Sequence, residues 1–268
     1  MNVSSDFNAT DGDGYELTMG RWSRRLAGVF LEFVGVREGE RVLDVGCGTG
    51  SLAAAVLQSS QRVEVDGVDG SPEYIEHAKS HHVDPRLRCR VGDACALEFP
   101  DGTFDRVLSL LMLHFVTRPQ DAIAEMRRVA KPGAVAAAAV WDARGGFVAG
   151  RMLLDTAAAL DPKAGEIRAR SLTRPMTRPG ELAAAWRAAG LADVKETSLQ
   201  IRMEFASFAD YWAPYLGKEG PAAAYVGSLG ETERTRLEGA VRAAYLDGEP
   251  DGPRSYAALA WAVRGVAP

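Results

Sequence analysis

The chain has 268 residues, of which 47% are hydrophobic and 25% are charged, and its formal net charge is −5. This composition is typical of a globular chain with a sizeable core and excludes a disordered one. The acidic balance argues against a nucleic-acid partner, because binding a phosphate backbone requires clustered Lys and Arg. The length predicts one α/β fold with an added insertion.

The cysteines indicate a reducing compartment. Cys47, Cys89 and Cys95 form neither an even disulfide set nor a Cys-x-x-Cys pair. We therefore expect a cytoplasmic protein without a metal site. The N-terminus lacks a basic start followed by an apolar core, and no apolar run approaches the length of a bilayer span. Neither export nor membrane insertion is expected.

Residues 1–35 are expected to form a lid segment and a helix. Residues up to about Gly14 are polar, rich in Gly and Asp and without periodicity, and we expect them to be mobile until something orders them. From Gly20, apolar residues such as Trp22 and Leu26 recur at helical spacing. This pattern predicts a helix that ends near Gly35.

The most specific stretch is residues 42–50, Val-Leu-Asp-Val-Gly-Cys-Gly-Thr-Gly. It predicts a strand, a tight glycine turn, and a helix that begins at Ser51. Such a turn lets the backbone approach a ligand that carries adenosine or a phosphate. The dinucleotide pattern Gly-x-Gly-x-x-Gly does not fit, because Gly50 comes one residue early. The spacing therefore disfavours a nicotinamide-dependent oxidoreductase.

Acidic residues follow the next two predicted strands. Residues 63–68 form the second strand, and Asp69 at its end precedes a helix start with Ser71 as N-cap. Asp69 lies roughly 20 residues past the glycine turn, where nucleotide-binding folds place a carboxylate that accepts hydrogen bonds from ribose hydroxyls. Residues 87–91 form the third strand, and Asp93 follows it at the edge of the same crevice.

The fourth and fifth predicted strands carry the candidate catalytic groups. Residues 106–110 form the fourth strand, and His114 lies just beyond its carboxyl end. His114 is either a general base or a histidine that shapes the pocket and bonds to the backbone. A helix at 119–130 and a strand at 133–141, buried on both faces, come next. Trp141 is a candidate wall for an apolar acceptor, and Asp142 is a weaker candidate base.

These motifs resemble those of the class I S-adenosylmethionine-dependent methyltransferases. In that family an acid at the strand end, here Asp44, precedes Gly-x-Gly-x-Gly, and the resemblance extends from about Tyr15 to Asp142. It is closest to the small-molecule, type 11-like members and to the core of the ubiquinone and menaquinone biosynthesis methyltransferases. It implies a Rossmann-like three-layer α/β sandwich with a mostly parallel seven-stranded sheet, an antiparallel last strand and a helical cap.

The resemblance also implies a site for S-adenosylmethionine and its product S-adenosylhomocysteine. Arg21 would pair with the methionine carboxylate, unless it is only a solvated arginine on an amphipathic helix. Asp93 would accept from the adenine amine beside apolar side chains such as Leu97. The cofactor-binding residues implied in this way are Tyr15, Arg21, Asp44, Gly46, Cys47, Gly48, Gly50, Asp69, Gly70, Asp93, Ala94 and Leu110.

The C-terminal part completes the sheet. We divide the chain into a lid segment and helix at 1–35, a cofactor-binding core at 36–145, and the rest of the sheet with helical cap insertions at 146–268. The insertions span about 146–178 and 206–250. An aromatic stripe in the second insertion (Phe208, Tyr211, Trp212 and Tyr215) fits a core more readily than a ligand pocket, yet acceptor selectivity is expected to reside in this insertion. The expected elements are helices at 150–160, 180–189 and about 231–245, strands at 194–205 and 257–264, and an irregular stretch at 161–179.

The expected activity is methyl transfer by in-line displacement to a small organic acceptor, in a monomer or homodimer. The methylated atom, O, N or C, is not determined. The fourth strand is not followed by the Asn-Pro-Pro-Tyr, Asp-Pro-Pro-Tyr or Pro-Cys motifs of enzymes that methylate nucleic-acid bases. The alternatives are an RNA- or protein-directed methyltransferase and a non-catalytic module that binds S-adenosylmethionine.

Overall fold

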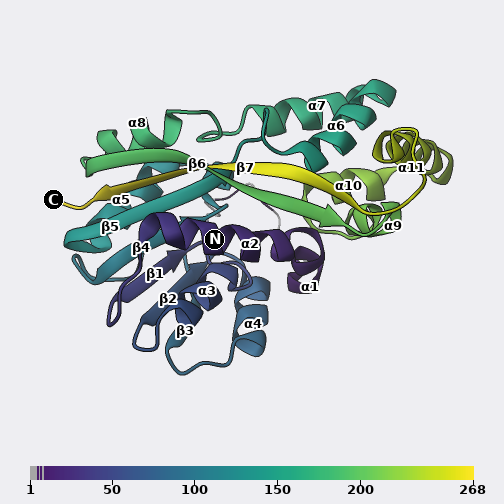
Figure 1. Cartoon of the computed structure of the whole chain (residues 1–268). Coiled ribbons are helices and arrows are strands. Elements are labelled where there is room, and N and C mark those ends of the chain that lie inside the picture. The colour runs from purple at the N-terminus through teal and green to yellow at the C-terminus, as the bar shows by residue number, and fades with distance from the viewer. Residues whose placement is uncertain (1–4, 6, 8) are drawn as a thin grey trace.

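A seven-stranded sheet forms the centre of the computed structural model, which describes residues 5, 7 and 9–268 (Figure 1). The strand order is β3-β2-β1-β4-β5-β7-β6. Only β7 runs antiparallel to its neighbours, β5 and β6, which confirms the predicted fold class. The strands are β1 (Arg41–Val45), β2 (Glu64–Asp69), β3 (Leu87–Val91), β4 (Phe104–Leu110), β5 (Ala130–Trp141), β6 (Ala192–Phe205) and β7 (Arg254–Val266).

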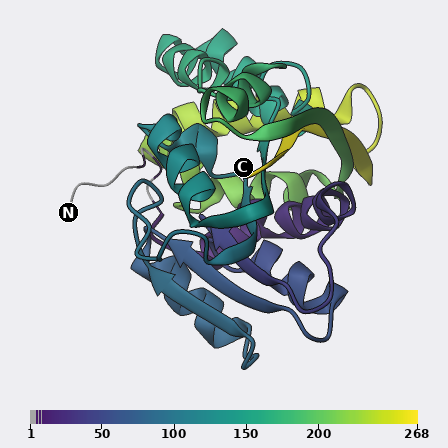
Figure 2. The same cartoon turned by 90° about the vertical axis from the view of Figure 1, so that its left-hand side faces the viewer.

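Helices cover both faces of the sheet. Successive side chains of a strand point to opposite faces, so Ala137 and Ala139 of β5 pack in one core while Ala136 and Ala138 pack in the other. The first core holds α2 (Arg21–Val34) and α3 (Ser51–Ser59), and the second holds α5 (Pro119–Val129) and α8 (Glu181–Ala188). The edge strands β3 and β6 lie on opposite sides of the molecule (Figure 2).

The strands β6 and β7 extend past the rest of the sheet and carry a helical cap. Strand β7 pairs with β5 only from Ala260 onwards, whereas its pairing with β6 continues back to Arg254. The cap lies at the projecting end of this pair of strands (Figure 1). It consists of α6 (Val148–Leu160), α7 (Pro162–Leu172), α9 (Phe208–Trp212), η3 (Ala213–Leu216), α10 (Gly220–Ser228) and α11 (Glu231–Leu246).

Helix α2 confirms the helix that was predicted from Gly20 to near Gly35. The segment before it departs from the prediction, because α1 (Gly12–Tyr15) and the π-helical turn η1 (Glu16–Gly20) run directly into α2. The rest of the predicted mobile segment falls partly on residues 1–4, 6 and 8, outside the described part of the chain. The predicted irregular stretch at 161–179 contains α7, whose start is capped by Asp161, which accepts from the Lys163 amide at 2.9 Å.

The two remaining helices follow the carboxyl ends of β2 and β4. They are α4 (Pro72–His81) and η2 (Leu113–Phe115). As predicted, Ser71 caps α4, since its hydroxyl accepts from the Tyr74 amide at 3.1 Å. None of the helices in the described part of the chain is long and apolar enough to cross a membrane.

Candidate active site

The glycine turn after β1 is held in a conformation that favours glycine. Gly46, Gly48 and Gly50 have φ values of 75°, 54° and 94°. A Cβ on Gly46 would lie 2.3 Å from Met112 Cγ, and a Cβ on Gly50 would lie 2.7 Å from His82 Cδ2, so these two positions are fixed by packing. A Cβ on Gly48 would meet nothing closer than Tyr74 Cδ2 at 3.9 Å. Gly48 therefore faces open space.

That space is a cavity of about 990 Å³ at the carboxyl ends of the strands. It is bounded by the glycine turn, by the lid residues Tyr15 and Met19, and by the cap. Ligands of open α/β sheets bind at this edge. The predicted site residues that line the cavity are Tyr15, Gly46, Gly48, Asp69, Gly70, Asp93, Ala94, Leu110, His114 and Trp141.

Asp69 joins the glycine turn to the start of α4. One carboxylate oxygen accepts from the Gly48 amide and the other from the Ser71 amide, both at 2.9 Å. Burial raises the pKa of Asp69, and these amide bonds offset part of the rise. Each oxygen keeps a lone pair that can accept from a ligand hydroxyl.

Asp44 lies buried in β1, one residue before the strand ends. Neither carboxylate oxygen makes a hydrogen bond of good geometry among the described residues. Burial raises the pKa of Asp44 well above its usual value, the nearby Cys89 and Asp69 raise it further, and the Ala53 amide offsets only part of the rise. Asp44 is 1% exposed and is not part of the cavity lining, so it acts on the cavity through the turn that follows it.

An apolar compartment adjoins the polar one in the same cavity. Its walls come from the ends of β5 and β6 and from the cap. The Trp141 and Phe147 rings stack with their centroids 5.4 Å apart, and the Phe205 and Tyr211 rings meet edge to face at 5.2 Å. The aromatic and sulfur-bearing residues of this compartment are Trp22, Trp141, Phe147, Met203, Phe205, Tyr211 and Tyr215.

The comparisons with known proteins agree with this geometry. Residues 43–138 match the model of a methyltransferase domain. Residues 43–138 belong to the class I S-adenosylmethionine-dependent methyltransferases. The match covers β1 to β5, which is the part of the fold that carries the glycine turn, Asp69 and Asp93.

Two curated proteins and one solved structure illustrate the similarity. The ubiquinone/menaquinone biosynthesis C-methyltransferase UbiE of Dinoroseobacter shibae is 32% identical over 49% of this chain and 53% of its own length. The erythromycin 3''-O-methyltransferase of Saccharopolyspora erythraea is 34% identical over 50% of this chain and 48% of its own length. The chain thus matches about half the length of these relatives.

The solved structure supports the fold. Phosphoethanolamine N-methyltransferase 2 of Haemonchus contortus, in complex with phosphomonomethylethanolamine and S-adenosylhomocysteine, has a TM-score of 0.60 and 16% identity. The alignment covers 96% of this chain and 57% of that one. At this identity the likeness concerns the architecture alone.

Several residues that the family resemblance placed in the methyltransferase site lie outside the cavity lining. Arg21 is one of them, since its Nη1 donates to both carboxylate oxygens of Asp210 at 2.9 and 3.2 Å. Its guanidinium also covers the Trp22 ring, with Cζ 4.3 Å from the centroid. Arg21 thus ties α2 to the cap. The guanidinium that was expected to pair with the methionine carboxylate of the ligand is therefore paired with Asp210 instead.

Asp142 and Leu97 also depart from their expected places. The carboxylate of Asp142 accepts from the Arg144 and Gly145 amides at 3.0 and 3.1 Å, so it closes the turn after β5. Leu97 is buried in the core between the sheet and α5. Neither side chain is part of the cavity lining.

Two positions of the glycine turn face away from the cavity. The Cys47 side chain is buried beside Cys89, and the hydrogen bond with that thiol first, and burial second, raise the pKa of Cys47 well above its usual value. Gly50 supports His82, whose Nε2 bonds the Thr49 carbonyl at 3.1 Å. Both positions, like Asp44, act on the cavity through the backbone and packing of the turn.

His114 lines the cavity from η2. The chain leaves β4 through Leu111, whose φ of 62° is unusual for a residue with a side chain and marks local strain. His114 is buried, and its Nδ1 has no hydrogen-bond partner among the described residues. Burial first, and the charge of Arg174 second, lower the pKa of His114 from its usual 6.5 to about 3. Its imidazole is therefore neutral at physiological pH.

This shift predicts a specific loss of stability in acid. In the unfolded chain His114 takes up a proton below about pH 6.5, whereas in the folded chain it does so only near pH 3. Between these values the unfolded state binds more protons, so stability falls as the pH falls. Lowering the pH from 7 to 4.5 should reduce the free energy of unfolding in the parent chain. We expect this reduction to be on the order of 2 kcal/mol smaller in His114→Gln, which lacks the imidazole. Urea unfolding at both pH values measures this difference, and parallel losses in the two chains would contradict the assignment.

No sequence pattern indicated a functional role for Glu219. This acid is only 3% exposed, although it lies in a loop between η3 and α10. One of its oxygens accepts from the Thr10 amide at 3.0 Å and from the Thr10 hydroxyl at 2.8 Å, and the other accepts from the Tyr74 hydroxyl at 3.0 Å. Glu219 therefore joins the N-terminal segment, α4 and the cap beside the cavity. Its role depends on contacts between segments far apart in the chain.

Proposed function

We propose that the chain transfers a methyl group from S-adenosylmethionine to a small, largely apolar acceptor. One observation carries the proposal. Gly48, Asp69 and Asp93 line the same cavity as the aromatic residues around Trp141. One cavity can therefore hold a donor and an acceptor side by side.

The polar end of the cavity fits the cofactor. The second lone pairs of the Asp69 carboxylate can accept from ribose hydroxyls, and Asp93, which lines the same cavity, would accept from the adenine amine. Gly48 leaves room for a ligand against the backbone of the glycine turn. When bound, S-adenosylmethionine supplies a methyl group on a positively charged sulfur, which an acceptor displaces in line.

The aromatic compartment favours an apolar acceptor. Its lining offers broad ring faces and few charges, which suits an aromatic or hydrocarbon-rich molecule better than a sugar or a peptide. The N-terminal segment and the cap contact each other beside the cavity through Thr10 and Glu219, and this closure favours a small acceptor over RNA or protein. The two relatives are named as a C- and an O-methyltransferase and the structural neighbour as an N-methyltransferase, so these similarities leave the methylated atom open.

The chain's own residues contribute mainly by positioning. Holding two reactants in line can lower a barrier by roughly 7–11 kcal/mol, whereas a general base contributes about 10²–10⁴-fold in rate. A neutral His114 with a pKa of about 3 is a weak base. Its Nδ1 can instead hydrogen-bond an acceptor hydroxyl or carbonyl. We infer that His114 orients the acceptor.

A labelling experiment tests the proposed function. The purified chain is incubated with S-adenosylmethionine labelled in its methyl group and with a panel of phenols, quinols and amines of increasing apolar size. We expect label in a small apolar product. Phe147→Ala removes a ring from the apolar compartment and is expected to raise the KM for that acceptor while leaving the affinity for S-adenosylhomocysteine unchanged.

Phe33→Ala is the matched control, because Phe33 is a partly buried aromatic residue of α2 outside the cavity lining. It should leave both constants unchanged. Label that enters added RNA or protein but none of the small acceptors would contradict the proposal. An equal effect of the two variants on the acceptor KM would contradict the assignment of the compartment.

A further inference from the structure

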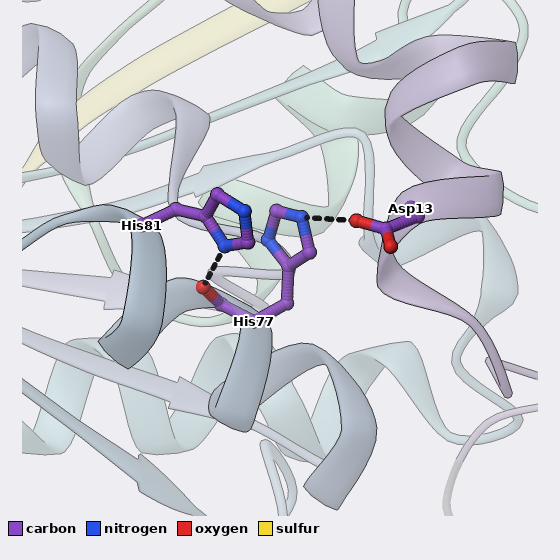
Figure 3. Close-up of side chains that lie close together, drawn as sticks. All are labelled: Asp13, His77 and His81. Atoms are coloured by element: carbon purple, nitrogen blue, oxygen red, sulfur yellow. Dashed lines mark hydrogen bonds and ion pairs between the residues drawn. The ribbon is translucent and has the colours of Figure 1, made fainter.

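A group of metal-ligand side chains lies outside the cavity, between the lid and α4 (Figure 3). Asp13 comes from α1, and His77 and His81 lie one turn apart on α4. Their candidate ligand atoms all lie within 4.8 Å of one another. His77 Nε2 is 3.2 Å from a carboxylate oxygen of Asp13, and the two imidazole rings stack with their centroids 3.9 Å apart.

The hydrogen bonds of the group leave one nitrogen lone pair, that of His81, for a cation. His81 Nδ1 lies 3.0 Å from the His77 carbonyl oxygen, which can only accept, so this nitrogen carries the proton (Figure 3). The lone pair of His81 then resides on Nε2. A backbone carbonyl that fixes the tautomer in this way is a usual second partner of a metal-binding histidine.

The packing of the lid brings Asp13 to this place. A Cβ on the neighbouring Gly12 would lie 2.6 Å from His77 Cβ, so only glycine lets α1 approach α4 this closely. The Asp13 side chain is 88% exposed, and solvent can therefore fill the remaining coordination positions of an ion. Within the described part of the chain, the ion pair with His77 is the one polar side-chain contact of Asp13, so its second oxygen can face such an ion.

We propose that Asp13, His77 and His81 bind a divalent transition-metal ion of the zinc type. Two imidazole nitrogens and one carboxylate are ligands that Zn²⁺ accepts, with water in the open position. Zn²⁺ holds these ligands at about 2.0–2.2 Å, so the ligand atoms, now up to 4.8 Å apart, must draw together, and the stacked imidazole rings must turn until their nitrogens face one ion. The ion would replace the proton shared by Asp13 and His77.

The ion would fasten the lid to the wall of the cavity. The same helix α4 that carries the two histidines provides Tyr74, and the lid provides Tyr15, whose ring centroid is 5.2 Å from that of Tyr74. Both residues line the cavity. Binding of Zn²⁺ therefore should strengthen the lid contact and slow release of S-adenosylhomocysteine, a consequence that rests on the proposed function, whereas the metal site itself does not.

Titration calorimetry of the full chain without an affinity tag tests the site, with ZnCl₂ as the probe. We expect one Zn²⁺ per chain, and affinity about tenfold or more lower in Asp13→Asn and in His81→Ala. Both side chains are exposed, so neither change should disturb folding. Glu76→Gln is the matched control, because Glu76 is an exposed carboxylate of α4 outside the group, and it should bind Zn²⁺ as the parent does.

Hydrogen exchange gives a readout that does not depend on catalysis. Zn²⁺ should slow exchange of the amides in residues 12–20 in the parent chain and in Glu76→Gln, but not in Asp13→Asn. Unchanged Zn²⁺ affinity in either ligand variant would overturn the three-residue site. Zn²⁺ binding that leaves exchange at 12–20 unaltered would overturn the link to the lid, even if S-adenosylhomocysteine binds normally.

Discussion

Replacing Gly48 with valine is expected to abolish binding of S-adenosylhomocysteine while the chain stays folded. A Cβ at this position would meet no protein atom closer than 3.9 Å, so the new side chain projects into the cavity. The bound ligand would occupy that space. We expect binding at least about 100-fold weaker, measured by titration calorimetry with the folded state checked by circular dichroism.

A matched variant separates the blocked cavity from backbone strain. Gly39 also has a positive φ, 78°, and a Cβ there would meet nothing within 4 Å. A residue with a Cβ in this conformation costs roughly 1–2 kcal/mol of stability at either position. Gly39→Val should therefore lose similar stability but keep its affinity for the ligand. Normal binding by Gly48→Val would refute the role of the glycine turn.

Removing the carboxylate of Asp69 is expected to produce the second-largest effect. Asp69→Ala should weaken S-adenosylhomocysteine binding by on the order of 1.5–3 kcal/mol, or roughly 10- to 150-fold, because charge-assisted hydrogen bonds to the ribose are lost. The same carboxylate accepts from the Gly48 and Ser71 amides, so its loss also loosens the glycine turn. Calorimetry at constant salt measures the change.

Asp142→Ala is a close control for this experiment. Like Asp69, Asp142 follows a strand and accepts two backbone amides, but its side chain lies outside the cavity lining. Asp142→Ala should lower the stability of the chain without lowering its affinity for the ligand. Equal losses of affinity in the two variants would show that turn closure, and not ribose binding, accounts for the effect of Asp69.

The sheet could be predicted from the sequence because its signals are local. The apolar run before Gly46, the N-cap at Ser71 and the continuous apolar strand ending at Trp141 each fix an element within a few residues. The tight turn predicted at Gly46, Gly48 and Gly50 is also a local signal, and all three glycines have positive φ. These elements also bring Gly48, Asp69 and Asp93 to one edge, since the carboxyl ends of parallel strands meet there.

The features that the sequence did not predict depend on contacts between segments that lie far apart in the chain. Arg21 pairs with Asp210, which lies in the cap, and no pattern around either residue signals the other. Helix α1 forms where Gly12 packs on His77, although its own sequence has no helical periodicity. Helix α7 has its start signal at Asp161, but only Ala164 of its residues is buried, so an apolar face was not apparent.

The most direct test of the whole account is the affinity of the purified chain for S-adenosylmethionine, S-adenosylhomocysteine and NAD, measured by titration calorimetry under one set of conditions. We expect micromolar binding of the first two ligands, with one site per chain, and no binding heat when NAD is added. Binding of NAD alone, or of none of the three, would contradict the assignment of the glycine turn and of the cavity that it borders.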